Sequence, residues 1–209
     1  MIQKAILALS LMFASNMAFA QEDKYQEGVH YFNLNQAQAS TDVVVVTEIF
    51  SYACSHCNTF EPYIQNWKKS IPENVKFTRI PVVFGNRSWE MMARGYIAAE
   101  MMGIVEKSHV AMMDAIWKQR QQFRSLDQLA DFYTGFGVEK DAFLAHYQSF
   151  AADSQLRKSQ RDVIQFGIQG TPSMVVNRKY RVVSSKDVNS FEIMLDVVDF
   201  LVEKETKSL

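Results

Sequence analysis

The sequence predicts an α/β fold in which a block of helices is inserted between two groups of strands. Three observations lead to this prediction. The chain of 209 residues first shows a strand-like segment, a helical segment and a second strand-like segment. It continues with a long helical stretch. It closes with two short strand-like segments and an amphipathic helix. No internal repeat or long linker separates these parts, so we expect one compact unit with an inserted subdomain.

The first twenty residues are predicted to be a signal peptide and not part of the fold. Lys4 supplies a positive start, residues 5–14 form a short apolar segment, and Ala-Phe-Ala at 18–20 is typical of a cleavage site. The apolar segment is shorter than the about 20 residues that span a bilayer. A buried N-terminal helix is the alternative. We expect export to a bacterial periplasm, where disulfides form and persist.

The first part of the fold is expected over residues 21–86. Residues 30–32 are predicted to form a short edge strand. Residues 43–50 form a continuous β-branched and aromatic run, typical of a strand buried on both faces. A helix is expected to begin near Cys57, and residues 75–80 alternate as the next strand. This is a β–α–β unit.

An all-helical insertion is expected over residues 87–166, followed by the rest of the first fold over 167–209. Apolar residues recur at helical spacing within 91–99, 110–117, 126–133, 143–150 and 155–166. Gly167 follows as a favoured residue for ending a helix. The last part has predicted strands at 173–176 and 180–183 and an amphipathic helix at 187–204. Three methionine pairs within the insertion are interpreted as core packing.

The charge of the chain is balanced, with 22 Lys and Arg against 23 Asp and Glu. A balanced chain without a basic tract gives no electrostatic footprint for nucleic acid or for a membrane surface. After residues 1–20, no apolar segment is long enough to cross a bilayer. We therefore expect a soluble exported protein.

The only two cysteines stand two residues apart, as Cys54-Ser55-His56-Cys57, directly after the predicted buried strand. A disulfide between them closes too small a loop to stabilise a fold of this size much. Their spacing at a strand-to-helix turn is the pattern of a thioredoxin-like redox motif. An inert structural disulfide is the first alternative. A zinc site is the second, but the remaining histidines lack ligand spacing and no metal is expected.

The position of the pair predicts different roles for the two thiols. Cys54 is expected at a helix N-terminus, where free N–H groups and the helix dipole favour a thiolate. His56 is expected to add a donor or a positive charge, although it is also typical of a solvated helix residue. We therefore assign Cys54 as the exposed nucleophile and Cys57 as the buried resolving thiol.

Two further features are predicted to belong to the site. Glu48 interrupts the apolar strand, where a buried carboxyl has a raised pKa suited to proton exchange with Cys57; a solvent-facing acid at a strand end is the alternative. Thr171 and Pro172 stand just before the strand at 173–176. A cis bond there would let the Thr171 backbone pair with an extended substrate, and an ordinary trans turn is the alternative.

With Glu48, the Cys-Ser-His-Cys motif and Gly170-Thr171-Pro172 together, the chain closely resembles the DsbA family of thiol:disulfide oxidoreductases. The resemblance covers nearly all of the chain. It implies a thioredoxin fold with a helical insertion, attack at Cys54, resolution by Cys57, a buried acid at Glu48 and a cis-proline at Pro172. Ser55 replaces a proline often found there and Thr171 replaces a common valine, which bears on oxidising strength and substrate preference.

The resemblance implies an oxidase that donates its disulfide to reduced, unfolded exported proteins. A membrane quinone-linked partner of the DsbB type would reoxidise it, without a bound cofactor. We expect a monomer. An isomerase normally needs a dedicated dimerisation module, and no extra segment is available for one. The alternatives are a reductase or isomerase of lower redox potential, and a non-catalytic binding protein with an apolar groove.

Overall fold

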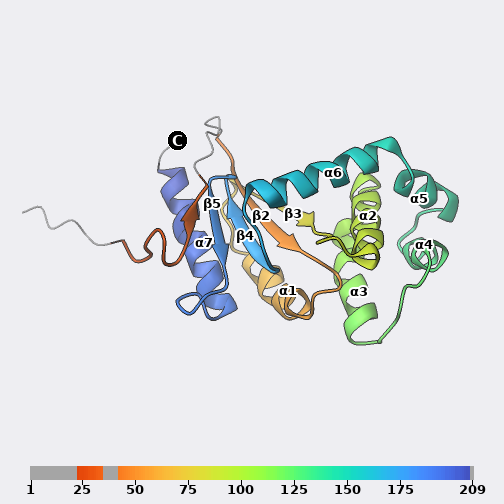
Figure 1. Ribbon diagram of the computed structural model, residues 1–209, viewed down its shortest axis with the longest axis horizontal. Helices are drawn as coiled ribbons and strands as arrows, with labels where there is room; N and C mark the ends of the chain where they lie inside the picture. The colour runs from red at the N-terminus through yellow and green to blue at the C-terminus, as the bar shows by residue number, and fades with distance from the viewer. Residues whose placement is uncertain (1–22, 35–41, 208–209) are drawn as a thin grey trace, which may run out of the picture.

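The computed structural model describes residues 23–34 and 42–207 (Figure 1). The predicted signal peptide at 1–20 lies outside the described residues. None of the helices in the described ranges is long and apolar enough to cross a membrane.

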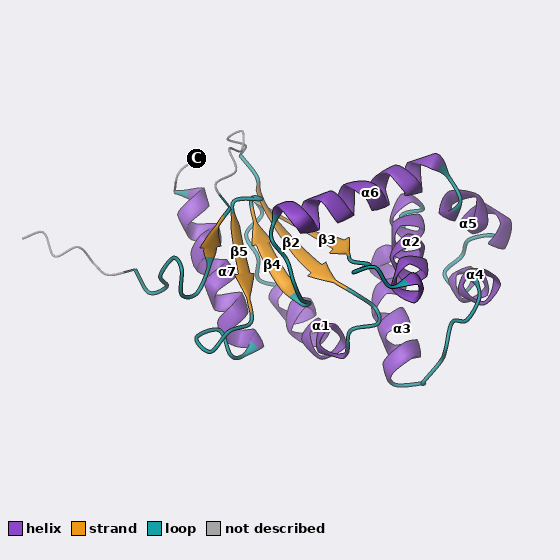
Figure 2. Ribbon diagram, viewed as in Figure 1, coloured by secondary structure: helices purple, strands orange, loops and turns teal. Residues whose placement is uncertain are grey.

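A five-stranded sheet forms one half of the molecule (Figure 2). Its strands are β1 (Phe32–Asn33), β2 (Val44–Phe50), β3 (Val75–Pro81), β4 (Ser173–Val176) and β5 (Tyr180–Val183), in the order β1-β5-β4-β2-β3. Only the β2–β3 pair is parallel, and the other three pairs are antiparallel. The apolar run of β2 is buried because strands flank it on both sides and helices cover its faces.

Helices α1 (Ser55–Trp67) and α7 (Phe191–Thr206) cover one face of this sheet. Phe60 and Ile64 of α1 pack in one buried cluster with Val44 and Val46 of β2. Since side chains alternate along a strand, Glu48 points to the same face as these two valines.

The inserted helices lie between β3 and β4 in the chain and beside the sheet in space (Figure 1). They are α2 (Arg87–Met101), α3 (Val105–Trp117), α4 (Leu126–Thr134), α5 (Lys140–Tyr147) and α6 (Phe150–Gln165). Gly95 lets α2 and α4 approach closely, because a Cβ at this position would lie 2.9 Å from Leu129 Cδ2. At the end of α6, Gly167 has φ +61°, as the predicted C-terminal glycine requires.

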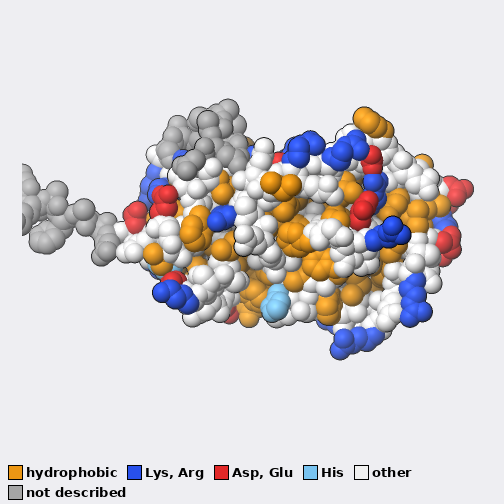
Figure 3. Space-filling model, in the orientation of Figure 1, with side chains coloured by type: hydrophobic (Ala, Val, Ile, Leu, Met, Phe, Trp, Pro, Cys, Tyr) orange, Lys and Arg blue, Asp and Glu red, His pale blue; other side chains and the backbone are white. Residues whose placement is uncertain are grey.

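The core of the helical block extends into the sheet half. Phe50, Tyr52 and Cys57, from the β2–α1 segment, belong to the same buried cluster as Met112, Leu129 and other side chains of the insertion. In the view of Figure 3, hydrophobic side chains also gather on the surface where the sheet meets the helices. The junction of the two halves is therefore continuous with the segment that bears the cysteines.

Most of the predicted elements are present, with shifted ends. Helix α1 begins at Ser55, two residues before the predicted start. Helix α7 begins at Phe191 and not at 187, because the Ser190 side chain accepts a hydrogen bond from the Ile193 N–H and caps the helix. Phe150, placed at the end of the fourth inserted helix by its spacing, instead starts α6 and is exposed.

The methionines of the insertion are mostly in the core, as interpreted from the sequence. Met112 and Met113 are fully buried, and Met91, Met92 and Met102 pack against the same cluster. Met101 is the exception, because its side chain is partly exposed. The domain boundaries at 87 and 166 stay a prediction.

Candidate active site

The turn between β2 and α1 positions the two cysteines. Cys54 is the N-cap residue of α1, with an extended backbone (φ −96°, ψ 117°), and its carbonyl accepts a hydrogen bond from Asn58 N–H at 3.2 Å. Cys57 lies in the first helical turn and is fully buried, whereas Cys54 is only partly buried. Both are free thiols. The predicted placement, with Cys54 outside and Cys57 inside, is confirmed.

Cys54 is surrounded by groups that favour its thiolate. The pKa of Cys54 is lowered to about 5, chiefly because the Cys57 thiol donates a hydrogen bond to the sulfur. Burial acts in the opposite direction, but the Thr171 side chain and the backbone N–H groups of Cys57 and His56 add further hydrogen bonds. The N–H contributions are those expected at a helix N-terminus. Cys54 is therefore ionised at neutral pH.

Cys57 is held in the thiol form. Burial raises the pKa of Cys57 far above its ordinary value, and its hydrogen bond to Cys54 and the nearby Glu48 charge raise it further. The pair thus consists of one ionised sulfur at the surface and one protonated sulfur beneath it. Since the thiolate is the nucleophile in thiol–disulfide exchange, the accessible sulfur is the reactive one.

Glu48 lies on β2, the strand that leads to the cysteines, and is fully buried. Burial raises the pKa of Glu48 to about 7, against the opposing attraction of Arg79. Arg79 Nε donates to Glu48 Oε2 at 2.7 Å, while Oε1 has no hydrogen-bond partner among the described residues. The alternative of a solvent-facing acid is wrong, and the raised pKa of this carboxyl is confirmed.

A buried polar network continues from Glu48 and was not predicted from the sequence. Arg79 also donates through Nη2 to both carboxylate oxygens of Glu61, at 2.9 and 3.1 Å. His109 Nε2 lies 3.2 Å from Glu61 Oε2, and its Nδ1 lies 3.0 Å from Tyr52 Oη. All of these side chains are buried.

Part of this network has a sequence signal. Arg79 continues the alternation of Val75 and Phe77, and the parallel register places it opposite Glu48. Glu61 follows Cys57 by four residues, so it lies on the buried face of α1. Arg79 on β3 and Glu61 on α1 both lie on faces that are expected to be buried, and opposite charges on two such faces predict an ion pair. His109 carries no such signal, because its contact needs the insertion to dock on α1.

Thr171 and Pro172 stand next to the cysteines in space, although 117 residues separate Thr171 from Cys54. The Thr171–Pro172 peptide bond is cis, so the alternative of a trans turn is wrong. Cys54 Sγ, as a thiol, donates to the Thr171 carbonyl oxygen at 3.3 Å. The antiparallel pairing of Ile49 with Ser173 holds this segment beside the end of β2.

His56 follows Cys54 by two residues, and its side chain is exposed. The part of His56 that favours the Cys54 thiolate is its backbone N–H. The predicted contribution of the imidazole stays a prediction. In the described ranges, no group of three His, Cys, Asp or Glu side chains is placed to hold a metal ion.

The arrangement defines a class of protein. A Cys-x-x-Cys pair at a strand-to-helix turn, with an ionised outer thiol and a cis-proline beside it, is the site of a thioredoxin-like dithiol oxidoreductase. Comparison with known families narrows this class. The model of the DSBA-like thioredoxin domain matches residues 45–196, and the chain belongs to that family.

Named relatives of the chain agree with this assignment. The chain is 36% identical to thiol:disulfide interchange protein DsbA of Pseudomonas aeruginosa, over 98% of this chain and 96% of that protein. It is 40% identical to DsbA of Azotobacter vinelandii, over 78% of this chain and 75% of that protein. The chain is thus a thiol:disulfide oxidoreductase.

Solved structures agree on the fold. The crystal structure of Pseudomonas aeruginosa DsbA matches with a TM-score of 0.80 and 34% identity, over 90% of this chain and 97% of that one. A serine variant of Proteus mirabilis DsbA with a non-covalently bound peptide matches with a TM-score of 0.71 and 28% identity, over 86% and 98%. The predicted thioredoxin fold with a helical insertion is confirmed.

Proposed function

We propose that this chain is a dithiol oxidase that introduces disulfide bonds into exported proteins by exchange at Cys54 and Cys57. The single observation that carries the proposal is the difference between the pKa values of the two thiols. The pKa of the accessible Cys54 is lowered to about 5, and that of the buried Cys57 is raised. A thiolate that is stabilised only in the reduced protein favours reduction of the disulfide. The oxidised protein therefore accepts electrons readily from client thiols.

The exchange has two steps. A client thiolate attacks the Cys54 sulfur, a bond forms between these two sulfurs, and the Cys54–Cys57 bond breaks with its electron pair on Cys57. A second client thiolate then attacks the client sulfur of this mixed disulfide, and Cys54 leaves as a thiolate. Two client thiols become one disulfide. One proton remains on Cys57 and the other goes to solvent, because Cys54 is ionised at neutral pH.

Glu48 is the proposed proton donor to Cys57 in the first step. The Cys57 sulfur is buried when it leaves the disulfide, and its electrostatic coupling to Glu48 supports a carboxyl close to this sulfur. With a pKa of about 7, Glu48 is partly protonated at neutral pH and exchanges its proton in either direction.

Thr171 and Pro172 are the proposed platform for the client chain. Their position beside Cys54 Sγ supports this role, since an extended segment bound there has its cysteine next to the reactive sulfur. The Proteus mirabilis relative with a bound peptide supports the same class of ligand. His56, exposed beside the pair, is proposed to assist the thiolate or the approaching client.

The setting of the reaction follows from the resemblance to DsbA. We infer a periplasmic monomer, exported by residues 1–20, with thioredoxin-fold parts at 21–86 and 167–209 around a helical domain at 87–166. A DsbB-type inner-membrane oxidase linked to quinone is the proposed partner that restores the disulfide. No bound cofactor and no nucleic acid enter the proposal.

The redox equilibrium with glutathione tests the proposal. The mature chain is expected to be reduced at glutathione ratios that leave a thioredoxin-like protein oxidised. Cys54→Ser is expected to abolish oxidation of a reduced client. Cys57→Ser, first converted by oxidised glutathione to a Cys54–glutathione mixed disulfide, is expected to exchange with a client thiolate, release glutathione and accumulate the mixed disulfide with the client. A thioredoxin-like potential would favour a reductase or isomerase. Client binding without thiol turnover, unchanged after loss of both cysteines, would favour a binding protein.

A further inference from the structure

Two buried carboxyl groups share one guanidinium, but they share it unequally. Glu61 accepts two hydrogen bonds from Arg79 Nη2, one from Gln65 Nε2 at 2.6 Å and one from His109. Glu48 accepts only the bond from Arg79 Nε, and its second oxygen has no partner among the described residues. Hydrogen bonds to the charged form favour ionisation. The geometry therefore concentrates the negative charge on Glu61.

The protonation of His109 follows from its two partners. Burial, and then the charge of Arg79, lower the pKa of His109 to about 4, so the ring is neutral at physiological pH. An ionised Glu61 can only accept, so Nε2 must carry the hydrogen and donate it. Nδ1 is then an acceptor, and Tyr52 Oη donates to it at 3.0 Å.

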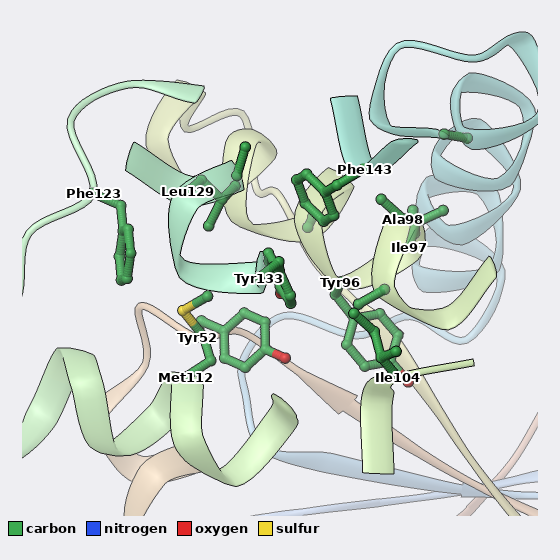
Figure 4. Close-up of a cluster of buried hydrophobic side chains, with 14 of the residues drawn as sticks. Tyr52, Tyr96, Ile97, Ala98, Ile104, Met112, Phe123, Leu129, Tyr133 and Phe143 are labelled. Carbon is green, nitrogen blue, oxygen red and sulfur yellow. The ribbon is translucent and has the colours of Figure 1, made fainter. Parts of the chain in front are cut away.

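His109 belongs to α3 of the insertion, whereas Glu61 belongs to α1 of the sheet half. A second bond joins α3 to the cysteine-bearing segment, from Trp117 Nε1 to the Tyr52 carbonyl oxygen at 2.9 Å. Figure 4 shows Tyr52 within the buried cluster, beside Met112 of α3 and Tyr133 of α4. The insertion thus contributes a polar donor to the acid pair of Glu48 and Glu61.

We propose that His109 is a positioning residue that fixes the negative charge of the acid pair on Glu61 and thereby leaves Glu48 as the carboxyl that exchanges a proton beside Cys57. The inference rests on the proposed role of Glu48. His109 touches neither cysteine nor client, and it acts through Glu61 and Arg79. His109 thereby determines that Glu48, and not Glu61, is the neutral carboxyl when Cys54 is a thiolate.

Charged and titratable groups face His109 from every element packed around it. The ring contacts Tyr52 before α1, Glu61 on α1 and Tyr96 on α2. Arg79 on β3 opposes protonation of the ring, while Glu61 and Glu106, the latter on α3 itself, favour it. Burial and Arg79 dominate, so His109 stays neutral over the pH range in which Glu48 titrates.

The test compares His109→Leu, which removes the donor, with His109→Gln, whose amide N–H replaces it. In His109→Leu, Glu61 loses a donor and Arg79 pairs more strongly with Glu48. We expect the Glu48 pKa, followed by carboxyl carbon NMR, to fall by about one unit. An ionised Glu48 repels the thiolate, so the Cys54 pKa rises and the glutathione equilibrium shifts roughly three- to tenfold toward the oxidised protein. His109→Gln is expected to restore most of both values.

Trp117→Phe is the matched control. It removes the other bond between α3 and the cysteine-bearing segment but leaves the donor to Glu61 in place. We expect it to lower the stability of the oxidised and reduced proteins alike, with unchanged Glu48 and Cys54 pKa values. Equal pKa shifts in His109→Leu and Trp117→Phe would show a general packing effect and overturn the proposal. No shift in His109→Leu would overturn it as well.

The unaltered protein provides a test that does not depend on a folded variant. The carboxyl carbon of Glu61 is expected to keep its ionised chemical shift between pH 5 and 8, while that of Glu48 titrates near pH 7. The reverse assignment overturns the inference. A reducing, thioredoxin-like potential alongside the expected titrations would instead overturn the oxidase function and leave the role of His109 standing.

Discussion

Glu48 links the redox site to the stability of the fold. Its folded-state pKa, about 7, lies above the ordinary value of 4.5, so the folded protein binds more protons than the unfolded chain between these two pH values. Stability therefore falls as pH rises through this window and is constant above it with respect to this group. A neutral residue of the same shape avoids that loss.

The first prediction concerns Glu48→Gln. The free energy of unfolding of the unaltered reduced protein falls from pH 5 to pH 8 as Glu48 ionises, whereas the variant has no carboxyl to ionise. The stability of the variant relative to the unaltered protein is therefore expected to be greater at pH 8 than at pH 5, by on the order of 2 kcal/mol. Urea unfolding at both pH values measures the difference. A stability difference that does not change with pH would contradict the raised pKa.

The second prediction concerns Thr171, whose side chain donates to the Cys54 thiolate. Thr171→Val removes the hydroxyl and keeps the shape, so the Cys54 pKa should rise by about half a unit to one unit. Thr171→Ser keeps the hydroxyl and is the control. Thiolate absorbance against pH measures both, and an equal pKa in the two variants would rule out the hydroxyl as a donor.

At the scale of single elements, the start of α1 sets the reactivity of the pair. Cys54 occupies the N-cap, where the side chains of most helices accept hydrogen bonds from the first turn. Here the Cys54 side chain makes no cap hydrogen bond, but the nearby N–H groups of Cys57 and His56 lower the pKa of its thiol. The backbone N–H groups that contribute most to the lowered Cys54 pKa are those of Cys57 and His56.

The third prediction follows from this detail. Ser55→Pro places proline at the first helical position, where its missing N–H costs little. Cys54 already has the extended backbone that a following proline requires. We expect stabilisation by about 0.4–1 kcal/mol through the unfolded chain, with a Cys54 pKa close to that of the unaltered protein. A rise of a full unit, seen in thiolate absorbance, would show that the Ser55 N–H matters after all.

At the scale of the whole molecule, the redox state of the pair is coupled to global stability. The reduced, folded protein holds a Cys54 thiolate with a pKa of about 5, below the ordinary thiol value of 9. Between these values the unfolded chain binds more protons than the folded one, so this stabilisation grows with pH and is lost below about pH 5. The oxidised protein has no thiolate and no such contribution.

The fourth prediction is that the reduced protein is more stable than the oxidised protein at pH 7, and that the difference shrinks at pH 4. Urea unfolding of the two forms at both pH values measures it, with the Cys54→Ser variant as a control that has no thiolate. An oxidised form that is more stable than the reduced form at pH 7 would contradict the oxidase function.

Much of the fold and part of the site were predictable from local patterns. The buried run of β2, the Cys-Ser-His-Cys turn and the helix periodicity each lie within a few consecutive residues. In the acid network, the pairing of Arg79 with Glu48 has a signal in the alternation of β3, but it also requires the parallel register of two strands. His109 meets Glu61 across 48 residues, after α3 packs against α1. Contacts of this kind depend on tertiary structure and leave no periodicity in the sequence.

The distance along the chain between Cys54 and Thr171 also has a consequence for synthesis. A polypeptide that emerges N-terminus first exposes its cysteine pair long before residue 171, which lies 117 positions later. During that interval the Cys54 thiol lacks the Thr171 hydrogen bond and the packing of the inserted helices. A partly made copy should therefore lack the part of the Cys54 acidity that Thr171 supplies, and the full acidity of this thiol should appear only when the chain is nearly complete.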